Sequence, residues 1–356
     1  MRKRHYHLCG NYKESYEEEL AIFETDFGRT WLLIGMFVLL VVIPLTGSEY
    51  TLYILNTIGI YAIAAIGLNL LIGFTGQISM GHGAFFGVGA YAAAVMTTRM
   101  GLPLLVALPM AGVFTAVVGM LFGIPSLRLK HLYLTIATLA GQFIIEYILV
   151  QWEGVTGGAE GIMVSNASIF GIELDSDRAF YFLIFISLIV LTWVMVNLIR
   201  TRFGRALVAI RDNDRAAEGM GIPIFKYKLL AFGISSFYAG FAGALFAFYM
   251  MTITPEPFNM WLSIEFIAMI IIGGLGSVSG AIFGTIFIVS LSEVLSMITE
   301  FLMNYGPAAS VSITIAPLRE FIFGLSIVLF IIFEPKGLAE IWRIVRSNFR
   351  LWPFSY

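Results

Sequence analysis

Residues 73–91, GFTGQISMGHGAFFGVGAY, constrain the fold of this chain more than any other stretch, because they lie between two apolar runs that can each cross a bilayer. The stretch holds six glycines, and a glycine inside a helix costs about 1 kcal/mol relative to alanine. Gln77 and His82 are also costly in hydrocarbon unless they face protein or a water-filled cavity. These costs predict a broken or closely packed helix beside a transport pathway. The alternative is that the glycines form only a face on which helices pack closely.

The composition of the chain is that of a membrane protein with several spans. Of the 356 residues, 59% are hydrophobic and 12% are charged, whereas a soluble domain carries about 25% charged residues. We therefore predict an all-α, polytopic membrane protein. The net charge of −2 implies nothing about nucleic acid, and no nucleic-acid partner is expected; the single cysteine, Cys9, excludes an intrachain disulfide.

Ten apolar windows are long enough, or nearly long enough, to cross the membrane, since a spanning helix needs about 20 residues. They lie at about residues 30–46, 51–72, 78–98, 102–124, 132–150, 179–199, 229–252, 262–276, 280–300 and 319–334. The sequence thus predicts about ten transmembrane helices with glycine-rich breaks. An even number of spans places both termini on the same side of the membrane.

The distribution of basic residues supports this count. With a cytoplasmic N-terminus, the inner segments are 1–29, 125–131, 200–228 and the residues after 334. All but three of the 21 Lys and Arg residues lie in these segments, as the positive-inside rule expects. The three exceptions are Arg99, Arg178 and Arg319. Adding or removing one span would invert every later loop and destroy the pattern.

The predicted organisation has three parts. They are a polar cytoplasmic N-terminal extension at 1–28, a transmembrane domain at 29–340 and a cytoplasmic C-terminal tail at 341–356. Two outer loops, 151–178 and 301–318, are long enough to face a partner outside the membrane, with a solvated connector as the alternative.

A second glycine-rich break, GGLGSVSG at 273–280, lies at a turn from an inward to an outward span, as the first break does. Matched interruptions in the two halves of a transporter point to its central pathway. The polar and glycine residues near the two breaks are therefore candidates for lining a translocation pathway. These candidates are Gly76, Gln77, Ser79, His82, Glu265, Gly274 and Ser277.

The longest inner loop, at 200–228, predicts a short amphipathic helix that ends at Gly219 and Gly221, before Pro223. It either lies on the anionic inner leaflet or docks into a soluble partner. Its acidic residues favour docking, because they would repel anionic lipid. The candidate docking residues are Arg205, Arg211, Asp212, Asp214, Arg215, Ala217, Glu218 and Gly221.

The remaining polar residues of the spans indicate no enzyme. Glu146, Glu265 and Glu293 lie within a few residues of predicted outer ends, where water reaches them. Asn69 and Gln142 are expected to form hydrogen bonds between helices. His82 has no second ligand at metal-binding spacing, so no metal site is expected. The chain has no nucleotide-binding or catalytic motif and cannot supply ATP energy by itself.

Several blocks together resemble one known family. They are GLNLLIGFTGQISMGHGAFFGVGAYAAAVM (67–96), IPSLRLKHLYLTIATLA (124–140), TGGAEGI (156–162), FGRALVAIRDNDRAAEGMGIPIFKYKLLAFGISSFYAGFAGAL (203–245), IIIGGLGSVSGAIFG (270–284) and FGLSIVLFIIFEPKGL (323–338). In this order they resemble the LivM-type permease subunit of bacterial branched-chain amino acid ABC importers. The resemblance runs from about residue 51 to 340 and leaves 1–28 unexplained.

The resemblance implies an all-helical permease in the bacterial cytoplasmic membrane. Its implied partners are a LivH-type second permease, two cytoplasmic ATPase subunits that hydrolyse ATP, and a periplasmic substrate-binding protein, while the chain itself binds no cofactor. The loop at 200–228 then corresponds to the region that docks on an ATPase. Its motif reads AAEGMG at 216–221, with Glu218 after the alanines instead of before them.

Two alternatives remain at this stage. One is a sibling ABC permease for urea, amides or other amino acids. The other, from a different class, is an ion-coupled transporter that works alone and uses Glu265 or Glu293 as its carrier. Dependence of uptake on ATP or on an ion gradient separates the two classes.

Overall fold

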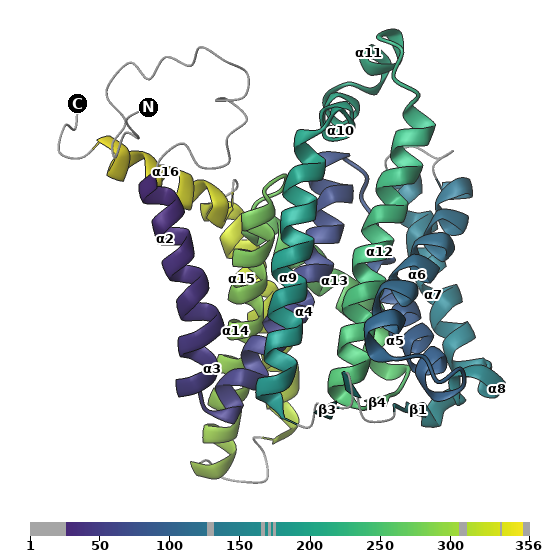
Figure 1. The fold of residues 1–356 in the computed structure, drawn as a ribbon, viewed down its shortest axis with the longest axis vertical. Helices are drawn as coiled ribbons and strands as arrows, with labels where there is room; N and C mark the ends of the chain where they lie inside the picture. The colour runs from purple at the N-terminus through teal and green to yellow at the C-terminus, as the bar shows by residue number, and fades with distance from the viewer. Residues whose placement is uncertain are drawn as a thin grey trace.

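The computed structural model describes residues 26–126, 132–164, 168–169, 172–173, 176–305, 312–334 and 337–351. It is a helical bundle with short surface elements at its two ends (Figure 1). Residues 1–25 of the predicted N-terminal extension lie outside the described residues, as do the tail residues after Leu351.

The helices of the bundle are, in chain order, α2 (Asp26–Phe37), α3 (Ile43–Thr46), α4 (Glu49–Asn69), α5 (His82–Thr98), α6 (Leu104–Ser126), α7 (Leu132–Gln151), α9 (Asp177–Arg200), α12 (Ile224–Met250), α13 (Met260–Gly273), α14 (Val278–Tyr305) and α15 (Ser312–Phe333). Two π-helical turns continue them: η1 (Val38–Val42) joins α2 to α3, and η2 (Leu70–Phe74) extends α4.

The surface elements divide between the two ends of the bundle (Figure 1). One end carries α10 (Arg202–Asp212), α11 (Asp214–Gly219) and α16 (Leu338–Leu351), and α2 also begins there. The other end carries α8 (Glu153–Thr156), η3 (Gly158–Glu160), η4 (Glu256–Phe258), β1 (Ile162–Met163), β2 (Ser168–Ile169), β3 (Ile172–Glu173) and β4 (Thr252–Ile253). Strand β1 pairs with β4, and β2 with β3, both antiparallel.

The all-α, polytopic fold predicted from the sequence is confirmed. Six helices are long and apolar enough to cross a membrane by themselves: Glu49–Phe74, Leu104–Pro125, Tyr133–Gln151, Asp177–Arg200, Ile224–Met250 and Val278–Ile298. Shorter apolar helices cover Leu33–Thr46, Met260–Gly273 and Phe321–Phe330. Each of the ten predicted windows falls on a helix. Nine of them fall on the helices just named, and the window at 78–98 falls on α5.

Two of the ten crossings are broken. Helices α5 and α13 have 17 and 14 residues, which correspond to about 25 and 21 Å, less than the roughly 30 Å of a hydrocarbon core. Helix α5 begins deep in the bundle, where His82 Nε2 donates to the carbonyl of Ala64 on α4 (2.9 Å). Helix α13 begins beside it, because Gly83 N donates to Ser263 Oγ (2.8 Å).

The chain therefore enters the bundle in non-helical form twice, from opposite ends. Residues 75–81 return from the end of η2 to the start of α5, so the helix expected from residue 78 begins only at His82. Residues 254–259, with the 3-10 turn η4, lead from β4 to the start of α13. The first entry confirms the break predicted at 73–83, and the glycine-rich segment predicted at 273–280 is the turn between α13 and α14, whereas the entry at 254–259 was not predicted.

Helices α4 and α12 form the centre of the bundle. Within their apolar windows 83% and 72% of residues are buried, against 28–39% for the other long spans. Glycines allow this packing: Gly243 of α12 lies against the Phe86 carbonyl of α5, and Gly89 of α5 lies against Gly240 of α12. Such close backbone approach is typical of membrane helices, which lack a hydrophobic driving force between them.

The predicted long loop at 301–318 is wrong. Helix α14 continues to Tyr305 and α15 begins at Ser312, and only residues 306–311 between them lie outside the described part. Pro317, a residue type that often marks a loop, lies in the second turn of α15. Membrane helices tolerate proline because neighbouring groups compensate for the lost hydrogen bond.

The packing of α12 on α5 gives a stability prediction. A methyl group at Gly243 would overlap the Phe86 carbonyl oxygen, whereas one at Gly324 of α15 would meet nothing within 4 Å. We expect Gly243→Ala to lower the free energy of unfolding by about 1–3 kcal/mol. Gly324→Ala should raise it by up to about 1 kcal/mol through helix propensity. Thermal unfolding of both purified variants measures this, and an equal effect of the two would contradict the packing.

Candidate functional site

The docking loop, residues 200–228, forms two helices where the sequence predicted one. Helix α10 buries the apolar side of its amphipathic pattern, including Leu207 and Ile210. The helix stops at Asn213, whose backbone is extended (φ −160°, ψ 103°) and whose Oδ1 accepts from Ala216 N (3.1 Å). Asn213 thus acts as the N-cap of α11, a role that its short amide favours.

The turn after α11 exposes an apolar side chain that the sequence analysis did not single out. Among the large apolar residues that the structure describes, Met220 is the most exposed, at 86%. It lies between Gly219 and Gly221, which has a φ of 82° that favours glycine. A flexible apolar side chain at a protruding turn suits contact with a partner protein.

The eight predicted docking residues lie together on α10, α11 and the following turn. Six are exposed, whereas Asp214 is half-buried and Ala217 is buried under α11. Arg205 donates to the carbonyl of Arg200 at the end of α9 (3.2 Å), and Asp214 lies 4.0 Å from Lys228. Arg205 and Asp214 therefore also hold the loop in place. Contact of these residues with an ATPase stays a prediction.

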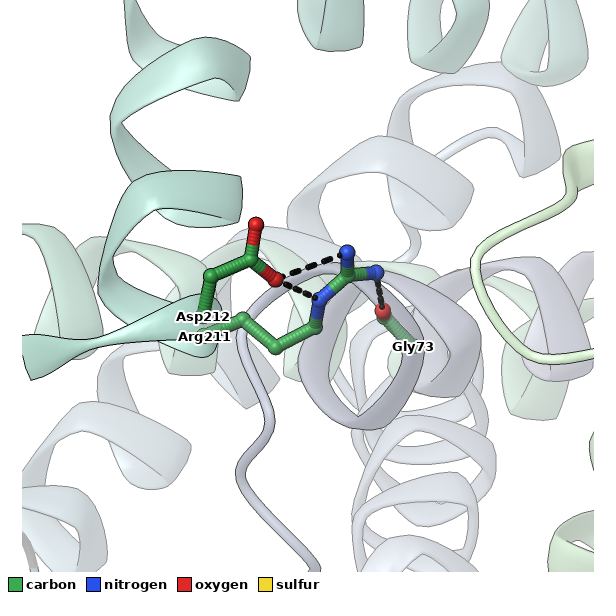
Figure 2. Close-up of polar contacts among 3 residues, drawn as sticks. All are labelled: Gly73, Arg211 and Asp212. Carbon is green, nitrogen blue, oxygen red and sulfur yellow. Dashed lines mark hydrogen bonds and ion pairs between the residues drawn. The ribbon is translucent and has the colours of Figure 1, made fainter.

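Arg211 connects the docking loop to the first helix break, as Figure 2 shows. Its Nη1 donates to the carbonyl of Gly73 at the end of η2 (2.9 Å), while Nε and Nη2 contact Asp212 Oδ1 (3.0 Å each). The carbonyl end of a helix carries partial negative charge, so a guanidinium is favourable there. The last turn of α4–η2 is thereby fastened to α10.

Asn69 connects the same place to the second break. Its Oδ1 accepts from Gly276 N (3.0 Å), and its Nδ2 donates to the Ser277 carbonyl (2.7 Å). Gly73 lies directly against Gly276, without room for a Cβ. Asn69, Gly73, Arg211, Gly276 and Ser277 form what we call the docking-end cluster. The two glycine-rich breaks, about 200 residues apart in sequence, meet in it.

A second set of hydrogen bonds joins the starts of the two short helices. Gln142 of α7 accepts through Oε1 from Ala84 N (2.8 Å) and from Ser263 Oγ (3.0 Å), and its Nε2 donates to the Phe258 carbonyl (2.8 Å). Ser263 Oγ in turn accepts from Gly83 N. Backbone N–H groups at helix starts need such partners when they are buried. The predicted interhelical roles of Asn69 and Gln142 are confirmed.

One side of residues 75–81 is open. Gly76 and Ile78 are exposed, Ile78 at 50%, while Gln77 and Ser79 between them are buried. Non-helical backbone at membrane depth is not stable against lipid and occurs only against protein or a water-filled cavity. The open face, Gly76 and Ile78, therefore adjoins either another protein or an aqueous passage.

Three of the seven predicted pathway residues lie at the docking-end cluster or beside it. Ser277 belongs to it, and Gly274 ends α13 with a φ of 114°. Gly76 (φ 72°) lies against Arg211, and a Cβ on it would be 3.1 Å from Arg211 Cγ. The structure thus brings residues of both breaks to the same end of the bundle as the docking loop.

Three others are enclosed by the chain itself. Gln77, Ser79 and His82 have exposed fractions of 3%, 2% and 2%. His82 is held by the Ala64 carbonyl, and Ser79 Oγ accepts weakly from Gly81 N (3.4 Å). The buried amide of Gln77 has no hydrogen-bond partner within the described residues, and any direct role of the three side chains in a pathway stays a prediction.

The two carboxylates proposed as ion carriers lie in different places. Glu293 accepts from Tyr50 in the first turn of α4 (3.0 Å), near the outer end as predicted. Glu265 was also predicted near an outer end, but it lies half-buried in the second turn of α13, which starts at the depth of Gly83. The reason is the non-helical entry at 254–259, which moves the start of α13 inward.

Comparison with known proteins assigns the family. Residues 50–331 match the family described as "Branched-chain amino acid transport system / permease component". The chain belongs to this family. The family match covers both helix breaks, the docking loop and the joined starts of α5 and α13.

The curated relatives include two kinds of permease subunit. The chain is 32% identical to the high-affinity branched-chain amino acid transport system permease protein LivM of Escherichia coli, covering 87% of this chain and 75% of the relative. It is 31% identical to the probable branched-chain amino acid transport permease protein LivH of Methanocaldococcus jannaschii, covering 74% of this chain and 87% of the relative. No solved structure matches the chain. The resemblance to LivM-type permeases is thereby confirmed.

The open face gives an accessibility prediction. With Cys9 replaced by serine, the chain has no cysteine, so a single new cysteine reports on its own surroundings. We expect Ile78→Cys in the assembled transporter to react with a charged, water-soluble thiol reagent at least about tenfold faster than Ile186→Cys, because lipid excludes such reagents. Ile186 on α9 is a matched control, since it is 53% exposed. Equal rates at the two positions would contradict an aqueous passage at Ile78.

Proposed function

We propose that this chain is the LivM-type permease subunit of an ATP-driven, binding-protein-dependent importer of the branched-chain amino acids leucine, isoleucine and valine. The observation that carries the proposal is the docking-end cluster, in which Arg211 fastens an amphipathic surface helix to the break between α4 and α5. An importer needs such a connection between a soluble motor and a membrane passage. Membership of the permease family and the names of the relatives support the substrate class.

The partners take positions at opposite ends of the bundle. One ATPase subunit faces α10, α11 and Met220 of this chain in the cytoplasm, the other faces the second permease, and both chain termini lie on that side. A periplasmic binding protein faces the end with β1 and β4. The basic residues of the docking loop support this orientation in the bacterial cytoplasmic membrane, because positive residues are retained inside.

A LivH-type second permease completes the passage. The open face of this chain supplies one wall, and the equivalent segment of the second permease supplies the other. Similarity of this chain to both LivM and LivH relatives supports two related halves of this kind. The non-helical backbone at 75–81 then faces the second permease and the water of the passage, not lipid.

The coupling follows from the hydrogen bonds. Closure of the ATPases on ATP moves α10 and α11 as a unit, and Arg211 carries this movement to the end of α4–η2. Asn69 carries it onward to the break between α13 and α14. Because the starts of α5 and α13 are joined through Gln142, both short helices shift together. The passage thereby opens to one side or the other without any ATP site on this chain.

The passage wall is suited to release of the substrate. Residues 75–81 carry no charged side chain, so the wall offers no strong partner for the two charges of an amino acid. Selection of leucine, isoleucine or valine therefore belongs mainly to the binding protein. The ion-coupled alternative gains no support from Glu293, because Tyr50 holds that carboxylate near the outer end.

Purification of the chain from its host membranes tests the proposal. We expect the second permease and two ATPases to co-purify, with ATP-dependent leucine uptake after reconstitution together with the binding protein. The double change Arg215→Glu and Met220→Asp should remove the ATPases and retain the second permease, because both residues are exposed on the docking loop. The control Arg178→Glu, exposed at the start of α9 at the opposite end, should retain all subunits. Recovery of the chain alone, with gradient-driven uptake that survives ATP depletion, would contradict the function.

A further inference from the structure

The lateral surface of the bundle carries an apolar groove away from the docking-end cluster. It lies between α14 and α16 and has a volume of about 570 Å³, within the usual range of ligand pockets. Its lining is apolar apart from Ser290, and it includes Phe283, Phe287 and Val294 of α14 and Trp342 of α16. The rings of Phe283 and Trp342, which both line the groove, meet edge to face with centroids 6.0 Å apart.

The groove has the depth of one membrane leaflet. Its lining on α14 runs from Phe283 to Val294, a rise of about 16 Å along a helix. Half of a hydrocarbon core is about 15 Å thick. The groove begins near the start of α14, at the end of the bundle that carries the docking loop (Figure 1). It therefore occupies the leaflet on the docking side.

Helix α16 has the character of a helix that lies in the membrane interface. In Figure 1 it crosses the docking end of the bundle at an angle to α14 and α15. Leu338, Ile341, Trp342 and Val345, at helical spacing, all line the groove. Trp342 is nevertheless 55% exposed, and tryptophan is enriched at the membrane–water boundary. The apolar side of α16 is thus only partly covered by this chain.

The polar side of α16 is basic. Arg343, Arg346 and Arg350 follow one another at helical spacing, and Glu340 is the only acidic residue of the helix. The side chain of Arg343 is 75% exposed and donates to Glu340 (2.6 Å), which orients its guanidinium and leaves further N–H donors available. Positive charge above an apolar groove at the level of the headgroups complements an anionic phospholipid.

We infer that the groove between α14 and α16 binds one anionic phospholipid of the docking-side leaflet, with an acyl chain along α14 and the headgroup near Arg343 of α16. The match of groove length to one leaflet and the basic side of α16 favour this occupant over a protein. The assignment to the cytoplasmic leaflet rests on the orientation in the proposed function, but the binding itself does not.

The bound lipid would support the break between α13 and α14. Gly337, immediately before α16, lies close against Gly274 at the end of α13, where an added Cβ would approach Gly274 N and Cα to 2.6 Å. Helix α16 is therefore anchored to the second glycine-rich break. A lipid that holds α16 against α14 also holds this break in position.

Photo-crosslinking in nanodiscs tests the inference. The complex purified through this chain is placed in an equal mixture of phosphatidylcholine and phosphatidylglycerol, with a photoreactive acyl chain on one lipid at a time. We expect phosphatidylglycerol to label α14 and α16 within the groove at least about fivefold more than phosphatidylcholine. Changing Arg343, Arg346 and Arg350 together to glutamine should abolish this preference. The matched control Arg178→Gln, at the opposite end, should keep it.

A second variant tests the groove independently of charge. Val294→Trp fills the groove and should reduce labelling by both lipids, whereas Ile332→Trp, at a 67% exposed position on α15 outside the groove, should not. Equal labelling by the two lipids, or a groove that the second permease shields in the assembled complex, would overturn the inference. Both leaflets of the nanodisc have the same lipid composition, so labelling does not depend on the orientation of the chain. Loss of the ATPases with retained labelling would therefore contradict only the proposed function.

Discussion

The structure depends on one constraint: backbone N–H and C=O groups at membrane depth need partners, because lipid supplies none. Two of the ten crossings contain non-helical backbone, and three polar side chains form hydrogen bonds with the backbone beside these breaks. Gln142 joins the starts of α5 and α13, Asn69 joins the ends of α4 and α13, and Arg211 caps η2 from outside the membrane. The third of these partners belongs to the docking loop, so the packing of the breaks and the proposed coupling to an ATPase use the same hydrogen bonds.

This arrangement explains why the glycines gather where they do. At Gly73 and Gly276 the two breaks approach without room for a Cβ, and at Gly243 helix α12 reaches the backbone of α5. The structure therefore confirms both a packing face and a helix break in the glycine-rich stretch, while its place beside a pathway stays a prediction. Gly89 packs against α12, Gly83 and Gly87 pack against residues 258–263, and Gly73 and Gly76 form the break.

Much of this was predictable from the sequence because membrane spans, glycine-rich breaks and basic loops leave strong patterns. The ten windows, the interhelical roles of Asn69 and Gln142, and the family all followed from residues. The break of the docking helix at Asn213, the depth of Glu265 and the extension of α15 past Pro317 did not. Each depends on tertiary contacts: a local cap, a non-helical entry anchored by Ser263, and neighbouring helices that tolerate a proline. Helix α16 lies largely within the segment predicted only as a C-terminal tail.

The central claim is that the docking-end cluster transmits movement as one unit. A double-mutant cycle with Arg211→Ala and Asn69→Ala tests it most directly, with ATP-driven leucine uptake measured in complexes that retain both ATPases. Each single change should lower uptake by roughly tenfold, and the double change should lower it by no more than about twofold beyond the stronger single change, because residues that act as a unit are not additive. A double loss equal to the product of the two single losses would show independent contributions and contradict the account.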